Sequence, residues 1–334
     1  MNLDQAARGA AVIVASKPPD PALVAAGFTG DERDLPPAMI RLGQVTLIER
    51  VIIRFQLVGS APVIVITGFE NELLERHLAR MSVVCLNNPD WKESTFFDDA
   101  MMGLDYAERT CPACEKVLLA TPLIPSVSKE TLMTLLASVE PVAVPVFEGE
   151  EGLPLAFHRG VIAKIPRRSA GKTPADLVSL SPGPVERIAV SDPGILSGLD
   201  RLVDSPGRKP GWIEKDPLPM RARLKLSLAR DSVFFGPGPA TLLRLIDETG
   251  SVRTACIRMK LSYSKGWQIL NLLEEELGAA VVDRQPGGQE GGSSKLTVTG
   301  RELLNRFEQL SSETQRSVNL LFDQIFRDFP PKEE

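Results

Sequence analysis

The chain has 334 residues, of which 43% are hydrophobic and 24% are charged, and its formal net charge is −5 at pH 7. This length allows two domains of ordinary size, and the apolar content is enough to bury a core in each. The charge is unevenly distributed: residues 1–217 carry 22 basic and 28 acidic side chains, whereas residues 218–334 carry 16 and 15. This balance favours the second part, rather than the first, as the domain that binds a polyanion such as DNA.

The sequence gives no sign of a membrane or an export route. No run approaches the roughly 20 apolar residues that a membrane-spanning helix needs, and no basic flank precedes the first apolar run as it would in a signal peptide. Four cysteines at irregular spacing do not form a disulfide framework. We therefore expect a cytoplasmic protein with no membrane partner.

Short apolar runs alternate with amphipathic segments through the first 146 residues. Residues 10–15 have the pattern of a strand that is buried on both faces. The alternation predicts a three-layer α/β domain with a mainly parallel sheet, in which ligands bind at the carboxyl ends of the strands. Further strands are expected at 62–67, 82–86, 116–120 and 141–146, and helices at 46–55, 70–81, 97–107 and 129–138.

This order of segments resembles the MobA-like nucleotidyltransferase family, which has the nucleotide-diphospho-sugar-transferase fold. The resemblance extends over residues 9–206. It implies transfer of a nucleotide from GTP, CTP or a similar donor, in some members to molybdopterin. The segments that carry it are AAVIVAS, MIRLGQVTLIERVI, VVCLNNPDW, MMGLDYA, VLLATPLIPSVSKETLMTLL and VSDPGILSGLD.

Three positions that this chemistry uses are altered together. Nucleotidyl transfer needs backbone amides around the phosphates, a cation near the developing charge and carboxylates that hold magnesium. Where the family has a glycine-rich loop, a lysine and an aspartate, this chain has residues 16–18 (Ser-Lys-Pro), Pro37 and Ala120. Proline has neither charge nor an N–H donor, and a methyl group cannot bind magnesium.

We therefore predict a domain that has lost catalysis and binds a nucleotide, a pterin or a related metabolite. Lys17, Arg33 and Arg41 are alternative sources of the lost positive charge. The cofactor is unknown, and magnesium with a nucleotide is required only if the domain is an enzyme. The predicted pocket residues are Ser16, Lys17, Arg41, Asn88, Pro89, Thr121 and Asp200.

The cysteine and histidine residues do not form a convincing metal site. Cys111 and Cys114 make an isolated Cys-x-x-Cys, and without a second pair or histidines we favour a free or redox-labile pair over a zinc site. The chain has only two histidines, His77 and His158, and two cannot support a metal cluster by themselves. We expect both to be structural.

Two acidic pairs are most simply explained as solvated surface. These are Asp98 with Asp99 and Glu150 with Glu151. The first pair has an alternative, because it follows the Asn-Pro segment at 88–89 and can face the pocket.

Residues 207–219 are rich in proline, glycine and charged side chains, which is typical of a linker. We therefore expect one domain at 9–206 and a second at 220–329.

The second domain begins with three helical patterns and a glycine-rich hairpin. The helices are expected at 240–249, 252–259 and about 263–277, with Gly250 ending the first and Ser251 capping the second. Strands at 280–284 and 295–299 enclose the glycine-rich run 285–294. This order predicts a winged helix-turn-helix, whose third helix places the side chains of its first turns against base edges.

The charge pattern indicates double-stranded DNA as the partner. Residues 221–265 contain nine basic and three acidic side chains in a chain that is acidic overall. A local excess of positive charge at such a motif is typical of nucleic-acid binding. The predicted DNA-binding residues are Arg253, Ser262, Tyr263, Ser264, Lys265, Gln268, Arg284 and Lys295, the last two at the base of the wing.

Residues 250–304 resemble the N-terminal DNA-binding domain of the molybdate-responsive ModE regulators, which are related to the LysR-type winged helices. Ser-Tyr-Ser-Lys at 262–265, the glycine-rich wing and Leu-Thr-x-x-Gly at 296–300 carry the resemblance. It extends over about 220–326 and implies a transcription regulator linked to molybdenum metabolism.

Residues 301–329 form a long helical pattern with more apolar surface than one winged helix can cover. We expect this helix to pair two copies in a homodimer, with a fold back onto its own domain as the alternative.

The leading hypothesis is a transcription regulator whose first domain senses a ligand of molybdenum-cofactor or nucleotide metabolism. The rival is a molybdopterin nucleotidyltransferase with a regulatory winged helix. A third hypothesis is a winged helix that binds a protein.

Overall fold

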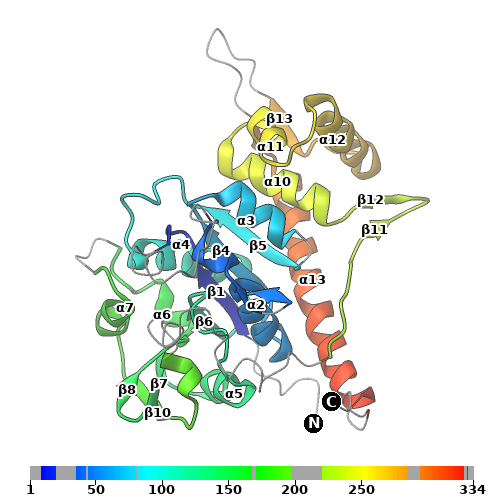
Figure 1. Ribbon diagram of the computed structural model, residues 1–334. Helices are drawn as coiled ribbons and strands as arrows, with labels where there is room; N and C mark the ends of the chain where they lie inside the picture. The colour runs from blue at the N-terminus through cyan, green and yellow to red at the C-terminus, as the bar shows by residue number, and fades with distance from the viewer. Residues whose placement is uncertain are drawn as a thin grey trace. The chain divides into compact units, whose positions relative to one another are not determined.

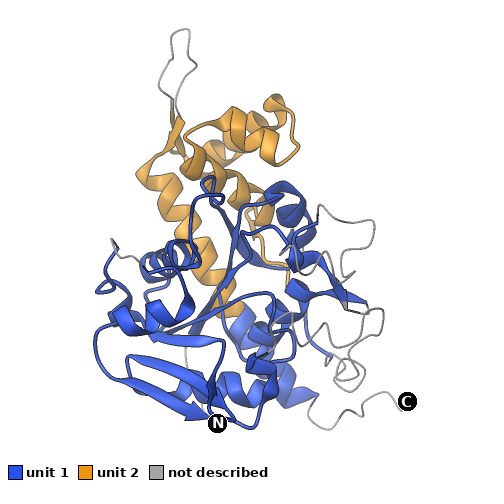
Figure 2. Cartoon of the chain, turned by 60° about the vertical axis from the view of Figure 1, so that its left-hand side comes forward, with its two compact units in different colours: residues 1–222, 315–334 blue, residues 223–314 orange. Residues whose placement is uncertain are grey.

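The computed structural model describes residues 9–19, 35–42, 44–79, 81–167, 171–196, 220–284, 294–326 and 329. The chain divides into two compact units, residues 1–222 with 315–334 and residues 223–314 (Figure 2). Within the described ranges, no helix is both long enough and apolar enough to cross a membrane.

The first unit is built on a mixed β-sheet (Figure 1). Its strand order is β10-β7-β9-β6-β1-β4-β5, with β8 paired to β7. β1 pairs in parallel with both β4 and β6, and β4 pairs in parallel with β5. The strands are β1 (Gly9–Val14), β4 (Val63–Thr67), β5 (Val83–Asn87), β6 (Lys116–Ala120), β7 (Val142–Phe147), β8 (Glu150–Glu151), β9 (Leu155–His158) and β10 (Val185–Ala189), beside a separate hairpin of β2 (Arg41–Leu42) and β3 (Val45–Thr46).

Helices cover both faces of this sheet. Successive β1 side chains point to opposite faces, so Val12 packs in one core and Ile13 in the other. One face carries α4 (Phe96–Thr110), α6 (Arg159–Ile162) and α7 (Pro174–Leu180), and the other carries α2 (Leu47–Leu57), α3 (Asn71–Leu78) and α5 (Lys129–Ala137). Two short 3-10 helices, η2 (Pro37–Met39) and η3 (Pro193–Leu196), complete the unit. The predicted three-layer α/β fold is confirmed.

Capping boxes fix where two of these helices begin. The Thr46 hydroxyl accepts the N–H of Glu49, whose carboxylate accepts the N–H of Thr46 at 2.8 Å. Thr95 and Asp98 make the same exchange at the start of α4. These bonds satisfy amides that have no partner inside the helix. Because the α4 box lies just after β5, it places the first turn of α4 near the carboxyl edge of the sheet.

The sheet departs from the predicted parallel order at β9. This strand follows β7 in the chain but lies between β6 and β7, antiparallel to both. β10 and α7 were also not predicted. Half-buried Glu186 and exposed Arg187 interrupt the apolar pattern of β10, which is an edge strand and therefore keeps one side in water.

The second unit contains the predicted helices and hairpin. α10 (Pro237–Thr249), α11 (Val252–Arg258) and α12 (Tyr263–Leu277) are followed by β13 (Val282–Arg284) and β14 (Ser294–Leu296), which pair antiparallel. Their core includes Phe235, Leu242 and Leu270. Two further short strands, β11 (Leu228–Ala229) and β12 (Val233–Phe235), precede α10. The winged helix-turn-helix is confirmed.

The long helix α13 (Val298–Ile325) contributes to both units. Its last part is anchored within the first unit: buried Arg316 donates to the carbonyl oxygens of Gly59 (3.3 Å) and Ala61 (3.2 Å), and Asn319 donates to that of Gln56. The expected helix at 301–329 therefore does not lie wholly in the second unit. The domain limits 9–206 and 220–329 stay a prediction, since residues 201–219 lie outside the described ranges.

Candidate functional sites

The carboxyl ends of the four parallel strands β1, β4, β5 and β6 meet at one edge of the sheet. The strand registers place Val14 beside Ile66 and Ile13 beside Ala120. The residues that follow these strands therefore share one edge, where ligands of open α/β sheets bind. Ser16, Asn88 and Thr121 of the predicted pocket lie there.

A fully buried carboxylate, Asp99 of α4, collects the polar side chains at this edge. Its Oδ1 accepts from Asn88 Nδ2 at 2.6 Å and from Ser94 Oγ at 2.8 Å, and its Oδ2 accepts from Ser16 Oγ. Lys17 Nζ lies 3.6 Å from the same Oδ2. A buried charge is costly unless it is paired and hydrogen-bonded, and these groups supply both.

The ammonium group of Lys17 is surrounded by oxygen atoms of the β5–α4 loop. It donates to the carbonyl oxygen of Trp91, to that of Ser94 at 2.5 Å and to Ser94 Oγ at 2.9 Å. An ammonium has three hydrogens to donate, so these bonds use its capacity. Lys17 therefore ties the segment after β1 to the loop before α4.

The backbone after β4 approaches the same segment closely. The Phe69 N–H donates to the Ser16 carbonyl at 2.8 Å, and the Phe69 and Trp91 rings meet edge to face at 5.4 Å. A Cβ on Gly68 would lie 2.5 Å from Trp91 Cβ and 2.7 Å from the Ser16 oxygen, so glycine is needed here.

The other predicted pocket residues do not join this cluster. Thr121 Oγ1 accepts the N–H of Leu123 at 3.2 Å in a turn after β6. Arg41 is exposed on the β2–β3 hairpin, and Pro89 is exposed beside Asn88. Asp200, like Arg33, lies outside the described residues.

In the second unit, α11 and α12 cross at close range. A Cβ on Gly266 of α12 would lie 2.2 Å from Cys256 Sγ of α11. Both residues are buried, and burial raises the pKa of the Cys256 thiol, with the Gly266 N–H opposing that rise. The small residue on α12 therefore allows the tight helix-turn-helix crossing.

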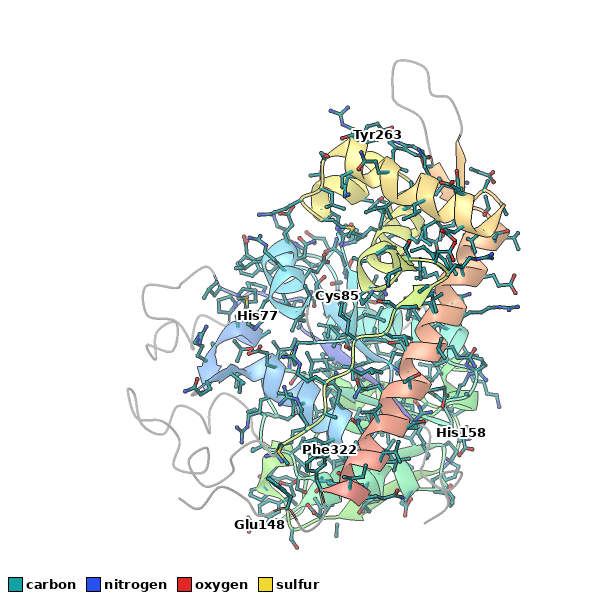
Figure 3. All side chains as sticks on the ribbon, turned by 90° about the vertical axis from the view of Figure 1, so that its right-hand side faces the viewer. His77, Cys85, Glu148, His158, Tyr263 and Phe322 are labelled. Atoms are coloured by element: carbon teal, nitrogen blue, oxygen red, sulfur yellow. The ribbon has the colours of Figure 1, made fainter. Side chains whose placement is uncertain are left out.

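The first turns of α12 present polar side chains to solvent. Ser262 caps the helix by accepting the Lys265 N–H at 3.2 Å, and the Ser264 hydroxyl lies 3.1 Å from that of Ser262. Tyr263 is 53% exposed at the helix start, with its ring edge to face with Trp267 at 6.0 Å (Figure 3). Gln268 is exposed two turns into the helix.

The basic residues of the second unit fall into two groups. Arg230, Arg244 and Arg258 make ion pairs with Glu276 (3.6 Å), Glu308 (2.6 Å) and Glu248 (3.1 Å). Exposed Arg253, Lys260 and Lys265 make no ion pair within the described part of the chain. The excess positive charge thus remains around the helix-turn-helix.

The two predicted wing residues lie on the hairpin strands. Lys295 is exposed on β14, opposite Asp283 of β13, which offsets part of its charge. Arg284 ends β13 opposite Ser294, and the wing loop 285–293 lies outside the described residues.

Part of the first unit matches a known protein family. Residues 33–182 match the family model described as the MobA-like NTP transferase domain. Residues 33–182 thus form a MobA-like NTP transferase domain. The resemblance expected from the sequence is thereby confirmed for this part.

The C-terminal region matches molybdenum-related proteins. The DNA-binding transcriptional dual regulator ModE of Escherichia coli K12 is 28% identical over 105 residues, which cover 31% of this chain and 40% of the relative. The molybdenum-pterin-binding protein MopB of Rhodobacter capsulatus is 32% identical over 100 residues, covering 28% and 37%. The chain thus spans less than half the length of these curated relatives.

Among solved structures, a nucleotidyl transferase from Methanothermobacter thermautotroptrophicus covers 57% of this chain and 91% of its own. The sequence identity is 19% and the TM-score 0.48.

The MobA-like domain has apolar residues at two of the altered positions. Ala120 is fully buried at the end of β6, and Pro37 starts the short helix η2. In the described ranges, no group of three His, Cys, Asp or Glu side chains could hold a metal ion. The described residues at the strand edge therefore do not fit a magnesium–nucleotide complex, and we assign them no catalytic step.

One prediction for the MobA-like domain was wrong. Asp99 is not solvated surface; it is fully buried and holds Ser16, Asn88 and Lys17. Asp98 is exposed and caps α4, as expected for a solvated residue. The capping box was a usable signal, because once Asp98 is assigned to Thr95, the next carboxylate must point elsewhere.

The remaining candidates have structural roles. His77 Nε2 lies 3.0 Å from Thr46 Oγ1 and 3.5 Å from Glu49, and His158 Nδ1 accepts the Gly160 N–H at 3.1 Å at the start of α6. Cys111 and Cys114 are buried, and the Cys114 thiol lies 3.5 Å from the Ala61 carbonyl oxygen. The two histidines are thus structural, as predicted, and the thiols are not exposed as a reactive pair would be.

Proposed function

We propose that the protein is a DNA-binding transcription regulator whose second unit binds duplex DNA through α12. The observation that supports this most is the start of α12, where Ser264, Lys265 and Gln268 are exposed and Lys265 makes no ion pair within the described residues. The match to ModE, a DNA-binding regulator by name, points the same way.

Gln268 and Ser264 would contact base edges, whereas Lys265 and Arg253 would contact phosphates. Gln pairs well with adenine, and its donor and acceptor discriminate between bases. Phosphate contacts add affinity without sequence preference. Substitution of a residue that contacts bases should therefore reduce sequence preference, whereas substitution of a residue that contacts phosphates should reduce affinity for every duplex.

The test begins with selection of a preferred duplex from a random pool, using the full chain. For Gln268→Ala we expect the preference for the selected over a scrambled duplex to fall about 5- to 100-fold. Binding to the scrambled duplex should stay unchanged. The matched control is Arg306→Ala, because Arg306 pairs with Glu302 on α13 and should affect neither value. Failure to enrich any duplex would contradict the proposal.

We further propose that the MobA-like domain senses a ligand of molybdenum-cofactor or nucleotide metabolism. The support is the fold, whose strand edge is a ligand site in open α/β sheets. The link to molybdenum comes from the C-terminal region, which is similar to MopB and ModE. Lys17 is bound internally, so Arg41 is the better cation among the described candidates.

The probes for this site are GTP, CTP and molybdate, each tested for a shift of Tm and of DNA affinity in the full chain. A ligand can alter DNA binding only if it binds the two states with different affinity. Turnover of labelled GTP or CTP with magnesium, abolished by Asp200→Ala, would instead support the rival enzyme hypothesis.

Pairing of two copies completes the proposal. On α13, Leu310, Leu321 and Ile325 are 45%, 48% and 72% exposed, and Phe322 stacks on Phe326 at 4.6 Å (Figure 3). A homodimer would cover these side chains and bring two recognition helices to a two-fold site. Sedimentation should show a dimer, and Leu321→Glu with Ile325→Glu should shift it to a monomer. A wild-type monomer at micromolar concentration would contradict this.

A further inference from the structure

The turn between α11 and α12 contains a lysine in a backbone conformation that favours glycine. Lys260 has φ 54°, in the left-handed region, where a Cβ is strained. Its N–H donates to the Ile257 carbonyl at 3.0 Å, and the Leu261 N–H donates to the Cys256 carbonyl at 2.9 Å. These two bonds form a Schellman motif, whose left-handed residue is usually glycine.

The two neighbouring helices, α10 and α12, have glycine at the residue where each helix ends. α10 ends at Gly250 and α12 at Gly278, both with φ 65°. The helices α10, α11 and α12 are thus each followed by a residue with a left-handed backbone. This residue is glycine after α10 and α12, and lysine after α11. Lysine is not required for this backbone conformation, because Gly250 and Gly278 adopt it at the ends of α10 and α12.

The Lys260 side chain is also available. It is exposed and makes no ion pair within the described part of the chain. It lies two residues before Ser262, the cap of α12, and five before Lys265. In a helix-turn-helix the first helix crosses the DNA backbone and the second enters the groove, so the turn between them lies near phosphates.

We infer that Lys260 binds a DNA phosphate and that its strained backbone is retained for this contact. The inference rests on the proposed DNA binding and adds one residue to it. Strain that the turn does not need is typical of functional positions, whereas a structural residue would make the turn more stable. Affinity and stability should therefore respond to substitution in opposite directions.

The test compares Lys260→Gly and Lys260→Asn with the wild-type full chain on the selected duplex. Lys260→Gly should raise Tm by about 3 °C because it relieves the strain. It should weaken DNA binding about 5-fold and make the negative slope of log affinity against log salt shallower by about 0.9, the value for one phosphate contact. Lys260→Asn, which tolerates this backbone and has no charge, should show the same loss of affinity.

The matched control is Gly278→Lys, which places the same side chain on the same backbone conformation at the far end of α12, about 22 Å away along the helix. It should lower Tm and leave DNA affinity unchanged. The inference is overturned if Lys260→Gly lowers Tm, or if it leaves the salt slope unchanged while Lys265→Ala reduces it. The proposed function itself fails if the wild-type chain enriches no duplex from the random pool.

Discussion

In the first unit the ammonium of Lys17 is surrounded by carbonyl and hydroxyl oxygens and paired with the buried carboxylate of Asp99. In the second unit Arg253 and Lys265 are exposed and make no ion pair within the described residues. A lysine near a strand edge and a lysine at a helix start look alike in the sequence. The difference shows that the partners of a positive charge, and not its position in a motif, decide whether it can bind a ligand.

Loss of the Asp99 carboxylate should have the largest effect. Asp99→Ala leaves the donors of Ser16, Asn88 and Ser94 without their acceptor and removes the ion-pair partner of Lys17. We expect the free energy of unfolding of the first unit to fall by about 3 kcal/mol. Urea unfolding followed by Trp91 fluorescence, in a chain with Trp212→Phe and Trp267→Phe, measures it. Asp98→Ala is the control, with the loss of about 1 kcal/mol that a helix cap gives. If both variants lost the same free energy of unfolding, the hydrogen bonds to Asp99 would contribute no more than a helix cap, and the account of Asp99 would be wrong.

The second largest effect should come from adding a methyl group between α11 and α12, which destabilises the second unit. Gly266→Ala places Cβ 2.2 Å from Cys256 Sγ, and we expect a loss of about 2 kcal/mol from overpacking. In a Cys256→Ala background the same change should cost less, which a double-mutant cycle measures. If Gly266→Ala lowered the free energy of unfolding equally in both backgrounds, the loss would not come from the contact with Cys256.

Removal of the Lys17 charge should have a smaller effect on the first unit. The Lys17 side chain is 38% exposed, so its bonds compete with water, and Lys17→Met should lower the free energy of unfolding by about 1–2 kcal/mol. The same unfolding assay applies. A variant as stable as wild type would mean that the ammonium is free to bind a ligand, and the comparison between the two units would fail.

The sequence predicted elements well and long-range partners poorly. Apolar runs such as residues 10–15 and the capping residue Ser251 are local signals, and they located β1 and the start of α11 correctly. The insertion of β9 between β6 and β7 depends on pairing across the sheet, for which no local pattern exists. Secondary structure was therefore predictable, but strand order was not.

The site residues divide in the same way. Ser262, Tyr263 and Lys265 are close in the sequence at the start of one helix, so the capping signal and the helical pattern place them together. Asp99 and Ser16 are 83 residues apart in the chain and meet only because β1 and the start of α4 share one edge of the sheet. The left-handed backbone of Lys260 was also not predictable, since lysine gives no signal for it.

The salt dependence of DNA binding tests the central claim most directly. The measurement is the slope of log affinity against log salt for the wild-type chain, for Arg253→Ala with Lys265→Ala, and for Lys17→Met, all on one duplex. We predict that the double variant makes the negative slope shallower by about 1.8, because two phosphate contacts are lost, and that Lys17→Met leaves it unchanged. A double variant with the wild-type slope, or an equal decrease in Lys17→Met, would contradict the account.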